Sequence, residues 1–179
     1  SSMQSVASGE RIIAECLAGQ LKVEPTVWTI HGYYNHCTLS VIHAAQTLDD
    51  PFGILAGWKA QLATYPPKLK QAIVDKHLKD AHFWIDNFHY LSAIQRGDVV
   101  YTAGIVQQTL HNLIQVLFAI NEVYFAGDKK ALDYVDGFEK NPDDFRAAVN
   151  RLLKPLNAGE WENPHAILKA LVNPVDDLI

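Results

Sequence analysis

Hydrophobic positions recur at helical spacing through the second half of the chain. Apolar side chains return at steps of three, four or seven between residues 68 and 96, and at alternating steps of four and three between 99 and 126. Steps of this size place side chains on one face of an α-helix, so both ranges are predicted to be long helices. Gly97 and Asp98 are typical of a helix end and the next helix start. Such a short connection predicts that the two helices lie antiparallel.

Shorter helices are predicted on both sides of this pair. Their apolar positions, prolines and capping residues define the ranges 6–21, 54–65, 129–137, 143–154 and 164–172. The range 99–126 also carries a second apolar face, which predicts a central helix covered on most sides.

A different pattern occupies residues 22–54. The stretches 26–30 and 38–42 are rich in β-branched and aromatic residues, and a loop around Gly32 separates them. Residues 46–54 are predicted to be a third short strand that ends in a turn at Asp50. The fold class expected is therefore mainly α, an antiparallel helical bundle with a small N-terminal β hairpin or remnant sheet. The expected division is an N-terminal helix and β region at 1–54 and a helical bundle at 55–179.

Composition narrows the classes of function. The chain has 179 residues, of which 49% are hydrophobic, and a net charge of −5. Its scattered basic residues give no footprint for nucleic acid, and no apolar run is long enough to span a membrane. Two cysteines without a metal-type spacing, and a start without the pattern of a signal peptide, favour a cytoplasmic protein. Ser1 and Ser2 before Met3 look like the remnant of an expression tag, which would mean that the chain was cut from a longer protein.

Polar residues interrupt the predicted central helix. His111, Gln115 and Glu122 follow one another at steps of four and seven, which puts them on one face. A buried amide must find hydrogen-bond partners, so such residues either tie helices together or line a cavity. We expect this face to border the small sheet or to open to a groove.

Two groups of histidines raise the question of a metal site. Zinc is commonly bound by histidine, cysteine and carboxylate side chains. One group lies on a predicted helix and the other on a loop: His82, Asp86 and His89, and His31, His36, Cys37 and His43. Three ligands on one straight helix are too far apart to share an ion, and the loop group has no known zinc-binding spacing. No metal site is expected, and Asp49 and Asp50 are interpreted as turn residues.

Several landmarks occur together in a fixed order. They are Leu48-x-Asp50-Pro51-x-Gly53, Tyr65-Pro66, Arg96-Gly97-Asp98, and the segment 115–122 followed by Tyr124 and two lysines. Over roughly residues 10–155 the chain resembles the C-terminal part of small nucleotidyltransferase-like proteins of the DNA polymerase β-type superfamily. The resemblance implies a bundle of four or five helices that packs against a catalytic α/β domain, closes over the acceptor substrate and contributes residues near the nucleotide.

The catalytic motifs of that superfamily are missing. Its core begins with a Gly-Ser turn and an Asp-x-Asp pair, because two metal ions must bridge the reacting phosphoryl oxygens. Neither motif occurs in this chain. The chain is then either the C-terminal portion of a longer enzyme or a relative that has lost the chemistry, and we expect it to be inactive alone. Magnesium and a nucleoside triphosphate are implied for a complete family member, but no cofactor is expected for this chain.

The resemblance also assigns roles to the polar residues. Glu122 would act as a general base near the acceptor hydroxyl. Residues expected to bind substrate or nucleotide are His111, Gln115, Asn121, Tyr124, Lys129 and Lys130. For the two lysines, a solvated position that favours a helix C-terminus is an equal alternative.

Two other classes of function are alternatives to a nucleotidyltransferase-like protein. A non-catalytic helical module for oligomerisation or partner binding, including a homodimer, remains open. A helical ribonuclease of the toxin type would need an arginine followed four to six residues later by histidine, and no arginine here has one. A small molecule or a nucleotide is therefore the expected partner, with no nucleic acid and no membrane.

Overall fold

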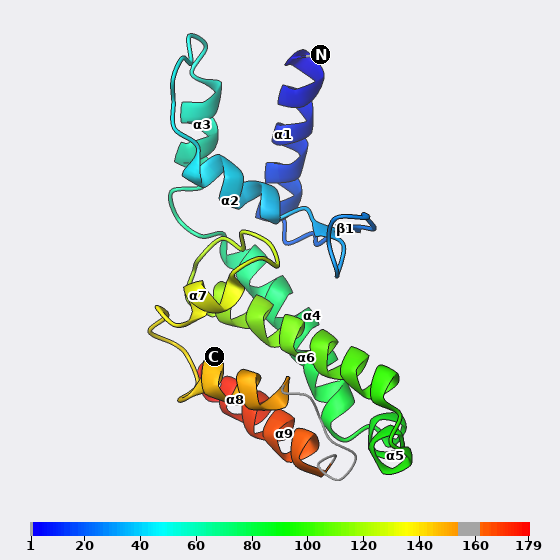
Figure 1. Cartoon of the computed structure of the whole chain (residues 1–179). Helices are drawn as coiled ribbons and strands as arrows, with labels where there is room; N and C mark the ends of the chain where they lie inside the picture. Colours follow the sequence, from blue (N-terminus) through cyan, green and yellow to red (C-terminus); the bar gives the residue numbers. More distant parts are fainter. Residues whose placement is uncertain (1, 154–161) are drawn as a thin grey trace.

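The computed structural model describes residues 2–153 and 162–179, and this part of the chain is mainly helical. Nine helices and one two-stranded sheet are found there (Figure 1). In chain order they are α1 Ser2–Leu17, β1 Val23–Glu24, β2 Tyr33–Tyr34, α2 Cys37–Ala44, α3 Ile54–Gln61, α4 Pro67–Ile85, α5 Phe88–Arg96, α6 Val99–Ile120, α7 Ala131–Val135, α8 Phe145–Leu152 and α9 Glu162–Asp176. The predicted fold class, helical with a small antiparallel sheet, is confirmed.

Helices α4 and α6 lie side by side and form the centre of the molecule (Figure 1). Lys70 at the start of α4 pairs with Glu122 just after α6, and His77 contacts Asn112 farther along. These pairs show that the two helices run antiparallel, as predicted. Helix α9 packs against both of them, and its Leu168 and Val172 are fully buried.

The range 68–96 is not one helix, which corrects the prediction. Helix α4 ends at Ile85, and α5 begins at Phe88. Between them, the Asn87 side chain accepts a hydrogen bond of 2.9 Å from the His89 backbone N–H. This is an N-cap, and it starts a new helix inside an apolar pattern that runs on without interruption. The predicted connection to α6 is confirmed, because Gly97 is left-handed and Asp98 caps α6 through the Tyr101 N–H.

Helix α6 ends at Ile120, six residues earlier than predicted. Asn121 turns its amide back onto the Leu117 carbonyl oxygen, and Glu122 adopts a left-handed conformation with φ of 57°. A non-glycine residue in this conformation stops a helix at a cost of about 1 kcal/mol or more. The chain then crosses the end of the bundle as an irregular segment that reaches α7 at Ala131.

The predicted strands at 26–30, 38–42 and 46–54 are wrong. The observed sheet pairs Val23 with Tyr34 and Glu24 with Tyr33. Residues 26–30 form the loop between the strands, and their apolar side chains Val27, Trp28 and Ile30 point outward. The β-branched and aromatic residues there predicted a strand, but these side chains are exposed in a loop and do not pack on a pleated surface.

Residues 38–42 belong to helix α2. Cys37, Leu39 and Ile42 are buried, whereas Val41 is 64% exposed. Contacts of one helix face outweigh the β preference of threonine, valine and isoleucine in this short stretch. Residues 46–53 are a turn in which the Asp50 carboxylate accepts hydrogen bonds from the Ile54 and Ala56 backbone N–H groups. Asp50 therefore starts α3, in agreement with its interpretation as a turn residue.

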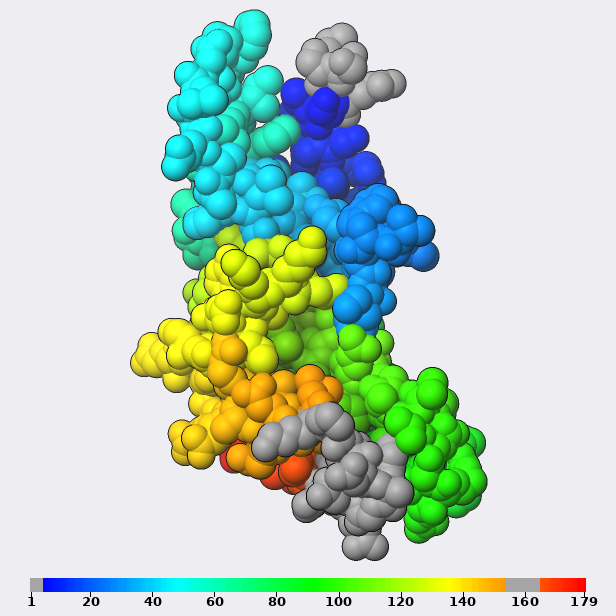
Figure 2. Space-filling view, in the orientation of Figure 1, coloured from blue at the N-terminus to red at the C-terminus, as the bar shows by residue number. Residues whose placement is uncertain are grey.

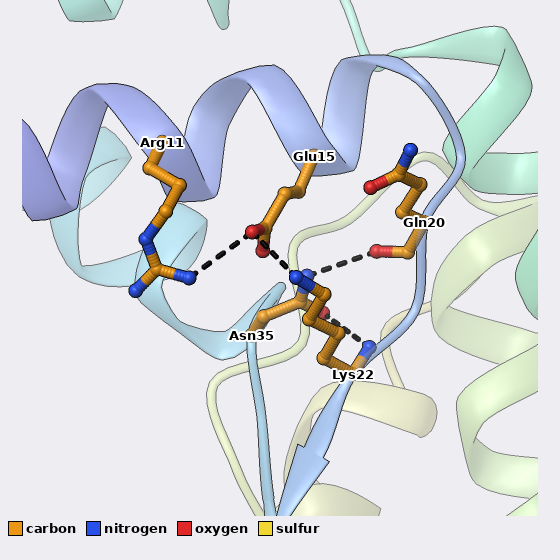
Figure 3. Close-up of polar contacts among 5 residues, drawn as sticks. All are labelled: Arg11, Glu15, Gln20, Lys22 and Asn35. Carbon is orange, nitrogen blue, oxygen red and sulfur yellow. Dashed lines mark hydrogen bonds and ion pairs between the residues drawn. The ribbon is translucent and has the colours of Figure 1, made fainter.

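Helices α1, α2 and α3 extend beyond the end of the α4–α6 pair (Figure 1). Gly9 on α1 lies against the Trp58 ring of α3, and a Cβ atom at this position would clash with the ring. At the base of this arm, Asn35 accepts a hydrogen bond from the Lys22 N–H and donates one to the Gln20 carbonyl oxygen (Figure 3). Glu15 pairs with Lys22 at 2.7 Å beside it (Figure 3). These contacts fix the loop and sheet that reach the middle of α6.

Candidate functional site

The buried polar side chains of α6 contact the segment around β2 and the neighbouring helix α4. The Nε2 atom of His36 lies 3.0 Å from the Gln115 Oε1, and His77 Nδ1 lies 2.8 Å from the Asn112 Oδ1. Both amide oxygens accept, so each imidazole donates its N–H. All four side chains are at most 1% exposed. The amides of α6 therefore tie the helix to its neighbours.

Burial decides the charge of these histidines. Desolvation lowers the pKa of His36 to about 4 and that of His77 to about 4, although the bonds to Gln115 and Asn112 raise it partly. Both imidazoles are neutral at neutral pH. In the described chain, four nitrogen atoms of this network, His36 Nδ1, His77 Nε2, Asn112 Nδ2 and Gln115 Nε2, have no hydrogen-bond partner. Each buried atom left without a partner costs about 1–3 kcal/mol, so these atoms lower the free energy of unfolding.

His111 is the member of α6 that connects this network to the surface. Its Nε2 atom lies 3.2 Å from the Tyr34 hydroxyl, and its Nδ1 atom lies 3.4 Å from the Asp128 carboxylate. Burial, followed by repulsion from His31, lowers the pKa of His111 to about 2. The contact with Asp128 is therefore between a neutral ring and a carboxylate, and is not an ion pair.

The surroundings of His111 fix its tautomer. Burial raises the pKa of Tyr34 to about 12, so the phenol keeps its proton and donates it to Nε2. The proton of the imidazole is then on Nδ1, which faces Asp128. The His31 ring stacks on His111 with 4.0 Å between the ring centroids. Tyr34, His31 and Asp128 thus hold the imidazole from three directions.

Two surface cavities meet beside this group. The first has a volume of about 220 Å³ and includes Trp28, Tyr33, Cys37 and Lys129 in its wall. The second, of about 230 Å³, is a recess over the middle of α6, between the segments coloured yellow and orange and the blue loop (Figure 2). Both cavities share Phe125 and Asp128. We call them the aromatic cavity and the His111 cavity.

The chemistry of these walls suits binding. Burial raises the pKa of Cys37 to about 12, which keeps its thiol protonated and unreactive. A neutral His111 with a strongly lowered pKa is a poor general base at neutral pH. Within the described ranges, no group of three or more histidine, cysteine, aspartate or glutamate side chains is arranged to hold a metal ion. His82 and Asp86 contact α9 instead, through Asp176 and Lys169.

The residues predicted to bind substrate fall into two sets. His111 lines its cavity, Gln115 reaches the segment after β2, and Lys129 lines the aromatic cavity. The expectation that this face borders the sheet is met by His111 and Gln115. Their roles in binding stay predictions.

The other predicted residues have structural contacts away from the two cavities. Asn121 exchanges hydrogen bonds with the Lys140 backbone, and Glu122 pairs with Lys70 at 3.0 Å. The Tyr124 hydroxyl donates to the Leu62 carbonyl oxygen. Lys130 adopts a left-handed conformation at the start of α7. The structure therefore does not bring Glu122 to His111, because the helix face on which they were expected to align ends at Ile120.

Sequence reasoning missed several residues of the site: Tyr34, Phe125, Asp128, and Trp28 and Ile30 in the loop before β2. The signal available was indirect. Asp128 follows Gly127, whose φ of 107° allows the turn that brings the carboxylate back to His111. In the sequence, His31 stands out only as a possible metal ligand, and the stacking of its ring on His111 was not predicted.

No helix in the described part of the chain is long and apolar enough to cross a membrane. No curated protein and no solved structure matches the chain. A family model does match it: residues 33–130, more than half of the chain, match the domain of unknown function DUF4037. This range contains the helices α4 and α6, the segment after α6, most residues that line the aromatic cavity and half of those that line the His111 cavity. The chain is therefore a member of the DUF4037 family.

Proposed function

We propose that this chain is the substrate-side region of a nucleotidyltransferase-like protein, and that it binds a nucleotide and a small acceptor molecule without transferring a nucleotidyl group by itself. The observation that carries this proposal is the pair of cavities that meet at Phe125 and Asp128. Two adjoining cavities suit two reactants that must be brought together.

The aromatic cavity has the chemistry for a nucleotide. Trp28 and Tyr33 offer ring faces on which a base stacks, and Lys129 offers a cation for a phosphate group. Trp28 is 72% exposed, so its ring is accessible to a ligand at the rim. Asp128 is the only carboxylate among the described residues that line either cavity, and one carboxylate does not hold two metal ions.

Binding is tested by titrating the chain with each nucleoside triphosphate in a calorimeter. We expect measurable affinity, and a roughly tenfold loss in Lys129→Ala, because one charge-assisted contact is worth about 1.4 kcal/mol or more. Lys140→Ala is the matched control, since this lysine is exposed and its side chain lies outside both cavities. Equal affinity in both variants would remove Lys129 from the site, and no binding of any nucleotide would overturn the proposal.

The absence of transfer is tested separately. The chain is incubated with labelled nucleoside triphosphates, magnesium or manganese, and hydroxyl acceptors, and pyrophosphate is measured. We expect no release, because Asp50 is occupied in capping α3 and no Asp-x-Asp pair exists. Release that is proportional to protein and lost in Asp50→Ala would show that the chain is a complete enzyme.

A second candidate is a non-catalytic module that binds a partner protein or a second copy of itself. It is favoured by the exposed apolar side chains of the loop before β2, where Val27, Trp28 and Ile30 are 99%, 72% and 68% exposed. Apolar groups gathered on a surface commonly mark an interface. Light scattering after gel filtration separates the two proposals: a dimer that Trp28→Ser dissociates favours the module, and a monomer that binds nucleotide favours the substrate-side region.

A further inference from the structure

The His111 cavity differs from the aromatic cavity in its charge. Its walls are mostly aliphatic, formed by Ile30, Leu110, Ile114, Leu132, Val149 and Leu153. Among the described residues that line it, Asp128 is the only carboxylate, and none is a lysine or an arginine. Lys129, which follows Asp128, lines the other cavity.

Asp128 is held in place from inside the protein. The His111 ring, which is 5% exposed, presents its Nδ1–H to one carboxylate oxygen at 3.4 Å. The Tyr34 hydroxyl fixes that ring from its other side. The side chain of Asp128 keeps 22% exposure, so the carboxylate remains accessible from the cavity.

Among the described residues, no lysine or arginine pairs with the Asp128 carboxylate, whose side-chain partner is His111. Burial keeps His111 uncharged, and the Tyr34 phenol is protonated. A carboxylate at the end of an apolar cavity favours a ligand that brings a positive charge, because the charges are shielded from water there. An anionic ligand would be repelled, and a neutral one would leave Asp128 without a counter-charge.

We propose that the His111 cavity binds a primary amine carried on an apolar body, with the ammonium group on Asp128 and the apolar body against the aliphatic wall and Phe125. The volume of about 230 Å³ exceeds the cavity of about 150 Å³ that accommodates benzene in another protein, so a single ring with a short side chain fits. The assignment of this amine as the acceptor rests on the proposed function above, whereas its binding does not.

The test uses three probes that share a 2-phenylethyl body and differ in the charge of the end group: 2-phenylethylamine, 2-phenylethanol and 3-phenylpropanoate. Binding to the full chain is measured by calorimetry at neutral pH. The amine is expected to bind at least about tenfold more tightly than the alcohol, as one shielded ion pair would give, and the carboxylate more weakly than both. An alcohol or a carboxylate that binds as tightly as the amine would overturn the proposal, as would no binding of any probe.

Variants locate the site. Asp128→Asn keeps the shape and removes the charge, so the preference for the amine over the alcohol is expected to disappear while the alcohol affinity changes little. Leu132→Phe fills the cavity and is expected to weaken both. Glu139→Gln, which removes an exposed charge outside the cavity, should leave every affinity unchanged. Circular dichroism establishes that each variant is folded, and an amine preference retained in folded Asp128→Asn would contradict the assignment.

The outcomes also separate this inference from the proposed function. Binding of the amine without binding of any nucleotide would leave the amine site in place and remove the nucleotide role of the aromatic cavity. Binding of nucleotides without an amine preference would do the reverse.

Discussion

The polar residues Asn112 and Gln115 inside α6 lie six to ten residues before Asn121 and Glu122, which follow the helix, yet the two sets have opposite surroundings. Asn112 and Gln115 are each 1% exposed, and each forms a hydrogen bond with a buried histidine from another part of the chain. Asn121 and Glu122 lie at the surface end of the helix and contact Lys140 and Lys70. The first set ties the helix to α4 and to the segment after β2, and the second set lies at the end of the bundle.

The difference shows how position within a helix decides what a polar residue does. A polar group in the middle of a buried helix must find a partner on another element, and four nitrogen atoms in the described network lack one. A polar group after the last turn finds the free carbonyl groups of the helix itself, as Asn121 does with Leu117. The first arrangement leaves buried nitrogen atoms unpaired and so reduces the stability of the fold, which suggests that it serves another purpose.

The largest expected effect is a loss of stability in acid. Unfolded histidine titrates near pH 6.5, whereas folded His36 and His77 take up a proton only near pH 4, and His111 near pH 2. Between pH 6.5 and 4 the unfolded chain binds more protons, so the free energy of unfolding falls as the pH falls. The slope is about 1.4 kcal/mol per pH unit for each of the three histidines. Urea unfolding at a series of pH values measures it.

Two variants test whether the buried histidines cause this dependence of stability on pH. His77→Gln removes one buried titrating group and should flatten the slope between pH 6.5 and 4. His82→Gln removes a histidine of the same helix whose side chain is 38% exposed, and should change the slope much less. Equal slopes in both variants would mean that the acid sensitivity arises elsewhere.

Gln115→Ala is expected to have the next largest effect. It leaves the buried Nε2–H of His36 without its acceptor and opens a small cavity, which together cost about 2–4 kcal/mol. Gln107→Ala, at an exposed position of the same helix, should change stability by less than about 0.5 kcal/mol. Thermal and urea unfolding of both variants measures the difference, and similar values would contradict the burial of the network.

Asn121→Ala should cost less, about 1–2 kcal/mol. The side chain makes hydrogen bonds to Leu117 and to both backbone groups of Lys140, but its partly exposed groups regain water when the bonds are lost. Ligand affinity at the two cavities should not change. A variant that is stable but loses ligand binding would support the prediction that Asn121 binds substrate or nucleotide.

Glu122→Gln is expected to have the smallest effect. Its partner Lys70 and its own side chain are both partly exposed, so loss of the ion pair costs less than about 1 kcal/mol. If Glu122 were a general base, this variant would abolish any activity of a larger assembly while stability stayed the same. Measurement of stability and of ligand affinity in parallel separates the two roles.

The sequence predicted α6 well because its apolar positions keep one spacing over many turns. It did not predict the break before α5, because the apolar pattern continues across the cap formed by Asn87. The strand expected at 38–42 failed because tertiary contacts outweighed β propensity in a short stretch.

Only those residues of the site that lie on α6 were predictable from the sequence. His111 and Gln115 stand out as polar residues in an apolar helix, but their partners Tyr34 and His36 lie 77 and 79 residues away along the chain. Asp128 reaches His111 through a turn at Gly127 that no spacing rule describes. Contacts of this kind depend on how the β2 segment and the chain after α6 cross the helix.

The central claim is that ligands bind beside the buried polar residues of α6 and not at the residues after it. A titration of the ¹⁵N-labelled chain with 2-phenylethylamine, followed by amide chemical shifts, tests it most directly. We predict that the largest shifts occur at Ile30, Ile114 and Asp128, with little change at Asn121 and Glu122. Shifts concentrated at Asn121, Glu122 and Lys140, with none around Asp128, would contradict it.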